Sequence, residues 1–149
     1  SNENGSITSL QTLYVPADDI SDPAVQRIQH ELDATIVLSR SVAEQGIRPA
    51  VDLNKTTSSL LTPEVVGDRH YLLSVQVQAL LQKYESLKSI IAIIGENELS
   101  PADRSDYAKA KKLIQNFTQD MHVMEKHNGI PGKSYTRDET LKSIEEILA

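Results

Sequence analysis

The sequence predicts a mainly α-helical protein, in which a C-terminal helical bundle follows the trailing strands of an incomplete α/β domain. Apolar residues recur at helical spacing in the second half of the chain. The first half instead holds short runs of β-branched residues between turn-forming residues. Pro63 follows a Thr- and Ser-rich stretch and marks the change. We therefore expect two parts, residues 1–62 and residues 63–149.

The first bundle helix is predicted from seven apolar residues at alternating steps of four and three, which places them on one stripe. They are Leu73, Val77, Leu80, Tyr84, Leu87, Ile91 and Ile94. Gly95 follows directly and is expected to end the helix. The same repeat also fits a coiled coil, but three helices joined by short loops favour a bundle.

Capping signals predict the starts of the other two bundle helices. Ser100 is expected to cap a helix that has Pro101 at its first position and Asp103 in its first turn. The sequence Thr136-Arg137-Asp138-Glu139 fits a capping box. The apolar faces behind these two starts hold Tyr107, Ala110, Ile114 and Phe117 in one helix and Leu141, Ile144 and Leu148 in the other.

The first half predicts two strands and a short helix. Ser6–Val15 alternates like a strand that stops at Pro16, and a loop rich in turn formers follows it. Ala34–Leu38 is a β-branched run typical of a buried parallel strand. Ser39 is then expected to cap a helix over Arg40–Gln45, which ends at Gly46.

Composition excludes several classes of protein. The net charge of −6 argues against a nucleic-acid backbone as the main partner. The longest apolar run, Ile90–Ile94, is far shorter than the roughly 20 residues that cross a bilayer, so no direct membrane insertion is expected. No signal peptide is visible at the N-terminus. The absence of cysteine excludes a disulfide framework and a thiolate metal site.

The residues alone offer little catalytic chemistry. The sequence has no phosphate-binding loop, dinucleotide fingerprint, HExxH motif or GxSxG motif. His122 and His127 are five residues apart, which does not place them on one helical face, so no metal site is expected. The turn with Asp18, Asp19 and Asp22 fits a charged loop, a hard-cation site or a docking surface. The residues therefore indicate a binding or structural module, or a piece of an enzyme whose catalytic parts lie elsewhere.

Several strings resemble the catalytic β subunit of F-type ATP synthase, in the same order and with nearly the same spacing. They are GSITSLQTLYVPADDISDP at residues 5–23, LDATIVLSR at 32–40, GIRPAVD at 46–52, IIAIIGENELS at 90–100 and GIPGK at 129–133. The resemblance implies a RecA-like nucleotide-binding domain that ends in the first half, followed by the family's C-terminal helical bundle. In the family, the phosphate-binding loop and the general-base glutamate lie upstream of the segments that these strings match.

The resemblance assigns two groups of residues to contacts with the rotating central stalk. Asp19, Ser21 and Asp22 match the family's catch loop. Glu98, Leu99, Ser100 and Asp103 match four of the seven positions of the family's acidic DELSEED lever. Asn97, Pro101 and Ala102 depart from that lever, so part of its charge is missing.

The resemblance also assigns residues near bound nucleotide. Tyr14 matches a tyrosine near the catalytic phosphates, and Tyr71 matches one that packs on adenine in the non-catalytic site. Arg48, Met121 and His127 occupy places where the family stacks aromatic rings on the catalytic adenine. Arginine and methionine can still pack on a base. Because the aromatic clamp is missing, these departures fit a divergent copy with a weakened or altered nucleotide site.

The full-length parent is therefore expected to be an ion-translocating rotary ATPase that couples ATP hydrolysis or synthesis to proton or other ion transport. Its expected cofactors are ATP and ADP with Mg²⁺, and its expected partners are the α subunits of a hexameric ring and the γ subunit of the central stalk. A peripheral complex on the cytoplasmic face of a bacterial membrane is the expected location. The chain alone is expected to be inactive and to need no cofactor, because it has no phosphate-binding loop. The alternatives are a non-catalytic β-like ring subunit and a free-standing helical interaction module.

Overall fold

The computed structural model describes residues 4–149, which divide into a first compact unit that ends at Leu32 and a second over Asp33–Ala149. The first unit holds a short 3₁₀ turn, η1 (Pro16–Asp18), and one helix, α1 (Pro23–His30). Asp22 caps α1 by accepting hydrogen bonds from the backbone amides of Ala24 and Val25. A loop was predicted for the residues before this helix and the helix itself was not predicted, although an acidic N-cap before a proline is a helix-start signal.

The predicted strand over Ser6–Val15 is wrong. Within the described residues no strand pairs with this segment, and the side chains of Ile7 and Leu10 are 97% and 94% exposed. Strands are stabilised by a hydrogen-bonded ladder and a buried face, and residues 6–15 have neither among the described residues. An alternating pattern alone is therefore insufficient here.

The second unit begins with a small antiparallel sheet. Strand β1 (Ala34–Thr35) pairs with β2 (Thr57–Ser58), with Ala34 opposite Ser58. The predicted buried parallel strand over Ala34–Leu38 is wrong, because the pairing is antiparallel and Leu38 is 71% exposed. Leu38 instead forms an isolated antiparallel bridge with Val51, so the chain turns back on itself between these two residues.

Helix α2 (Arg40–Glu44) lies inside this loop and ends one residue before the predicted end. Ser39 stands at its N-cap position, but its hydroxyl bonds to the Ser41 hydroxyl at 2.8 Å and caps no backbone amide. Gly46 follows the helix in a left-handed conformation with φ 78°, as expected for a residue that ends a helix.

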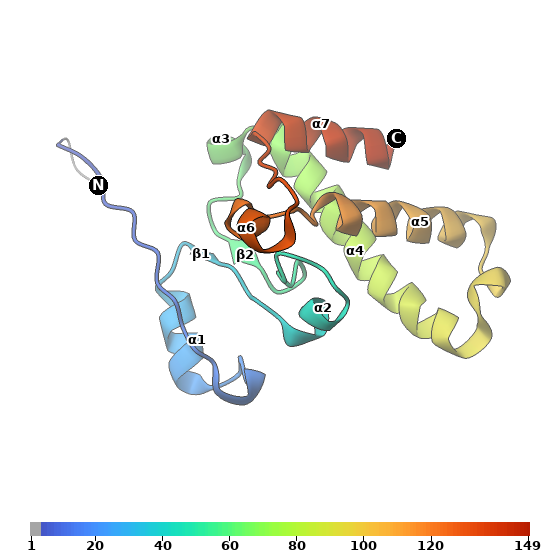
Figure 1. The fold of residues 1–149 in the computed structure, drawn as a ribbon, viewed down its shortest axis with the longest axis horizontal. Coiled ribbons are helices and arrows are strands. Elements are labelled where there is room, and N and C mark those ends of the chain that lie inside the picture. The colour runs from blue at the N-terminus through green and yellow to red at the C-terminus, as the bar shows by residue number, and fades with distance from the viewer. Residues whose placement is uncertain (1–3) are drawn as a thin grey trace. The chain divides into compact units, whose positions relative to one another are not determined.

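The bundle forms as predicted and makes the protein mainly helical. After α3 (Pro63–Val66), the long helix α4 (Asp68–Ile94) packs against α5 (Pro101–Asn116) and α7 (Arg137–Leu148) (Figure 1). The short elements η2 (Glu96–Glu98), η3 (His122–Met124) and α6 (Glu125–Asn128) lie in the connections. Gly95 ends α4, Ser100 caps α5, and Thr136 and Glu139 form both bonds of the predicted capping box.

The bundle core lies where the three long helices meet. Its buried members are Leu73, Leu113, Leu141 and Ile144, with Val77, Leu80, Phe117, Ile147 and Leu148 packed against them. Leu113 is completely buried and is a core residue that the predicted face of α5 omitted. A bidentate ion pair, with 2.7 and 2.8 Å contacts between Arg69 and Glu145, joins the start of α4 to the end of α7. This bond lowers the pKa of Glu145.

Candidate functional site

The connection between α4 and α5 is the first candidate site, because it holds the residues that resemble the acidic lever. We call residues 95–100 the tip. Gly95 has φ 88°, a left-handed conformation that favours glycine, and it lets the chain leave α4 sharply. One turn of 3₁₀ helix follows, and Leu99 is then only 8% exposed. Leu99 therefore anchors the tip and does not present itself to a partner.

Ser100 and Asp103 form a reciprocal cap at the start of α5. The Ser100 hydroxyl accepts a hydrogen bond from the Asp103 backbone amide at 3.1 Å and donates one to the Asp103 carboxylate at 2.7 Å. Pro101 occupies the first helical position. These contacts fix the first turn of α5, so the predicted stalk residues Ser100 and Asp103 both have a structural role in this chain.

Two cationic side chains brace the tip. The Lys83 ammonium on α4 lies 2.8 Å from the Asp103 carboxylate and 2.6 Å from the Asp106 carboxylate. These contacts, first with Asp103 and then with Asp106, raise the pKa of Lys83, and the Lys83 contact lowers the pKa of Asp103. The Arg104 guanidinium donates to the backbone carbonyl of Asn97 at 2.8 Å.

Glu96 and Glu98 are the acids of the tip that stay available. Both are exposed, and neither carboxylate forms a hydrogen bond or ion pair with the residues that the structure describes. Glu98 is therefore the predicted stalk residue best placed to meet an external basic partner. Electrostatics at such exposed contacts sets register and encounter rate more than affinity.

The predicted catch loop lies in the first unit, and its side chains are engaged locally. One Asp19 carboxylate oxygen accepts hydrogen bonds from both the backbone amide and the hydroxyl of Ser21. Asp22 caps α1, as described above. Geometry thus gives Asp19, Ser21 and Asp22 roles in shaping a turn and starting a helix.

Among the predicted nucleotide-proximal residues of the second unit, Arg48 and Met121 lie on segments that a hydrogen bond joins. The Arg48 guanidinium donates to the backbone carbonyls of Ala43 and Ile47, both at 2.9 Å. The Arg48 carbonyl accepts from the backbone amide of Gln119 at 2.9 Å, which joins this loop to the segment just before Met121. Tyr71 is half-buried in the first turn of α4, and Tyr14 is 80% exposed in the first unit.

Met121 precedes, and His127 lies within, a compact loop that Glu125 holds together. The Glu125 carboxylate accepts from the Gly132 backbone amide at 2.7 Å and lies 2.8 Å from Nδ1 of His122. The Gly132 bond first, and then the His122 contact, lower the pKa of Glu125. His127 is exposed near the end of α6. Glu125 and Gly132 were not predicted from the sequence, because their role depends on a contact between residues seven positions apart.

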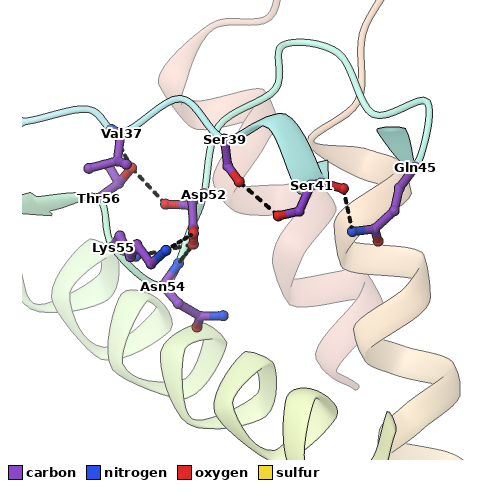
Figure 2. Close-up of polar contacts among 8 residues, drawn as sticks. All are labelled: Val37, Ser39, Ser41, Gln45, Asp52, Asn54, Lys55 and Thr56. Atoms are coloured by element: carbon purple, nitrogen blue, oxygen red, sulfur yellow. Dashed lines mark hydrogen bonds and ion pairs between the residues drawn. The ribbon is translucent and has the colours of Figure 1, made fainter. Parts of the chain in front are cut away.

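A pocket of about 510 Å³ lies between residues 41–55 and the helices α4 and α5. Its apolar lining includes Val42, Ile47, Leu81, Tyr84, Ile114 and Phe117. On the rim, Asp52 accepts hydrogen bonds from the amides of Asn54 and Lys55 and pairs with the Lys55 ammonium at 3.3 Å (Figure 2). Thr56 bonds the same turn to Val37 (Figure 2).

The lining of this pocket differs from the set of residues that the resemblance places near nucleotide. Arg48, Tyr71, Met121 and His127 are not among its lining residues, although Ile47 and Pro49, on either side of Arg48, are. Among the described residues, no cluster of three or more His, Asp or Glu side chains could hold a metal ion. No described helix is long and apolar enough to cross a membrane.

Two protein-family models match consecutive parts of the chain. Residues 1–58 match the ATP synthase alpha/beta family, nucleotide-binding domain, and residues 60–129 match the C-terminal domain of V and A type ATP synthase. The chain is therefore similar, in this order, to a nucleotide-binding domain and a C-terminal domain of ATP synthase subunits. The C-terminal match is to the V and A types, whereas the strings quoted above resemble the F type.

A solved structure has the same fold over nearly the whole chain. It is described as a unique ATP synthase subunit, NeqB, from Nanoarcheaum equitans, and the TM-score is 0.83 at 22% sequence identity. The match covers 99% of this chain and 35% of that subunit. The chain thus spans about a third of the length of the subunit that it matches.

Proposed function

We propose that the chain is the C-terminal region of a ring subunit of a rotary ATP synthase, and that its tip contacts the central stalk. The observation that carries this proposal is the braced connection between α4 and α5, in which Glu96 and Glu98 are exposed and unpaired within the described residues. Leu99 and the Ser100 cap hold the tip in one shape. A rigid tip transmits displacement, whereas a flexible one absorbs it.

We further propose that the parent is a divergent, β-like subunit with a weakened nucleotide site. The Arg48 guanidinium is bound to two backbone carbonyls of its own loop, so stacking on a base would cost it both hydrogen bonds. Met121 and His127 supply no aromatic clamp of the kind that the F-type β family uses. In this reading the parent serves mainly as a structural partner in a hexameric ring.

The second candidate is the catalytic β subunit of an F-type enzyme, which the strings YVPADD and LDATIVLSR favour. Under that proposal the parent binds ATP or ADP with Mg²⁺, alternates with α subunits around a γ stalk and couples hydrolysis or synthesis to ion transport. Both candidates place the complex on the cytoplasmic face of a membrane. A phosphate-binding loop and a general-base glutamate in the parent reading frame would select the catalytic candidate.

Co-expression of the full-length parent with the other ring and stalk subunits from the same genome tests the ring proposal. We expect the parent to co-purify in a ring of six nucleotide-domain subunits, which native mass spectrometry would count. A phosphate-binding-loop lysine variant of the parent should leave ATPase activity largely unchanged if the site is weakened. A parent that stays monomeric with all partner subunits present would contradict the proposal.

A further inference from the structure

The contacts of Lys83 are not needed to build the bundle core. Lys83 lies on α4, eleven residues before Ile94, which is about 16 Å along the helix axis at 1.5 Å per residue. Its ammonium reaches across to α5, where Asp103 and Asp106 stand one turn apart on the same face. One cation thus holds two carboxylates near the start of the next helix.

We propose that Lys83 is a positioning residue that fixes the start of α5 against α4 and thereby sets the place of the tip. We call Lys83, Asp103 and Asp106 the clasp. A role for the clasp in transmitting force depends on the proposed stalk contact, but the effect of the clasp on the position of the tip does not. The tip spans the connection between α4 and α5 (Figure 1), so a change in their relative position moves it.

Neighbouring contacts link the clasp to the tip. Asp103 accepts the Lys83 ammonium with one carboxylate oxygen and the Ser100 hydroxyl with the other, so the clasp and the α5 cap share one side chain. The rings of Tyr84 and Tyr107, which follow Lys83 and Asp106 in the sequence, stack at a centroid distance of 5.0 Å. The clasp therefore joins an aromatic contact on one side to the helix cap on the other.

The clasp is suited to positioning because it contributes little to global stability. The side chains of Lys83 and Asp103 are 41% and 34% exposed, and exposed ion pairs stabilise a fold only weakly. The buried core of Leu73, Leu113, Leu141 and Ile144 does not include these residues. A variant without the clasp should therefore fold normally while its tip opens more often.

Hydrogen exchange on the 149-residue chain tests this directly. Lys83→Met removes the charge and keeps most of the apolar stem, whereas Lys83→Arg keeps the charge. Lys88→Met is the matched control, because Lys88 lies on the same helix and its ammonium forms no ion pair among the described residues. In Lys83→Met, we expect roughly three- to tenfold faster exchange at the Leu99, Asp103 and Arg104 amides, which are bonded within the tip and cap. Exchange in α7 should not change, and Lys83→Arg and Lys88→Met should resemble the unmodified chain.

Two outcomes would overturn the proposal. If the tip amides of Lys83→Met exchange at the original rate, the clasp does not position the tip. If all amides accelerate equally, Lys83 acts on global stability alone. Rotation of an assembled complex then tests the clasp and the stalk contact separately. Reduced torque in Lys83→Met supports both proposals. Unchanged torque with a loosened tip would contradict the stalk contact and leave the clasp in place.

Discussion

Replacing Leu113 with alanine should lower the free energy of unfolding by about 2–5 kcal/mol. Leu113 lies on α5 and is completely buried against α4 and α7, where it packs with Leu73, Leu141 and Ile144. Truncation removes apolar contacts and leaves a cavity that the surrounding helices can fill only in part. Urea unfolding followed by circular dichroism would measure the loss.

Leu72→Ala is the matched control, because Leu72 is 58% exposed on α4, next to a core residue. Alanine favours helix slightly more than leucine, so this change should shift the unfolding free energy by less than about 0.5 kcal/mol. A Leu113→Ala loss no larger than the Leu72→Ala shift would contradict the described core.

Gly132→Ala should destabilise the protein by about 1–3 kcal/mol, the usual cost of forcing extra atoms into packed space. A Cβ at this position would clash with both Cα and N of His122, closer than real contacts allow. The backbone must therefore move apart, and the 2.7 Å bond from the Gly132 amide to Glu125 should break.

The pKa of Glu125 provides a local readout of this change. The Gly132 amide is the main cause of the lowered pKa, so breaking that bond should raise the pKa of Glu125 toward its ordinary value. Because the pKa of Glu125 in the folded protein is lowered, the bond stabilises the fold at pH values above the ordinary glutamate pKa. This stabilisation is lost as the pH falls through the pKa of the folded protein.

Carboxyl NMR titration of the Gly132→Ala and Lys133→Ala variants would measure this pKa. Lys133→Ala is the control, because the Lys133 side chain is exposed and its backbone amide can keep its bond to Asp120. An unchanged Glu125 pKa in Gly132→Ala would show that the loop accommodates the methyl group.

Local signals predicted the bundle well. Gly95, Ser100 and Thr136 act on backbone groups within a few residues, so the sequence around each one contains nearly all of the relevant interaction. The apolar stripe of α4 was also largely right, since Leu73 and Leu87 are buried. Leu81 lies outside that stripe but is only 4% exposed, because residues 41–55 cover this side of α4 and form a pocket with it.

Strands and side-chain roles were harder to predict because they depend on distant partners. The run at Ala34–Leu38 has strand composition, but its pairing is set by residues 51–58. The acids at Asp19, Asp22 and Asp103 could be recognised as charged, but their hydrogen bonds to Ser21, the α1 amides and Lys83 depend on the folded geometry. The sequence therefore predicted the position of the tip, but it could not distinguish Asp103, which is engaged at the start of α5, from the available acids Glu96 and Glu98.

Photo-cross-linking from the tip tests whether the tip contacts the central stalk. In the assembled full-length complex, Glu98 would be replaced by p-benzoylphenylalanine, and Glu146, an exposed acid on α7, would be replaced in a matched control. After illumination, mass spectrometry would identify the attached subunit. We expect a cross-link from position 98 to the central stalk and none to the stalk from position 146. Stalk cross-links of equal yield from both positions, or none from position 98 in an assembled complex, would contradict it.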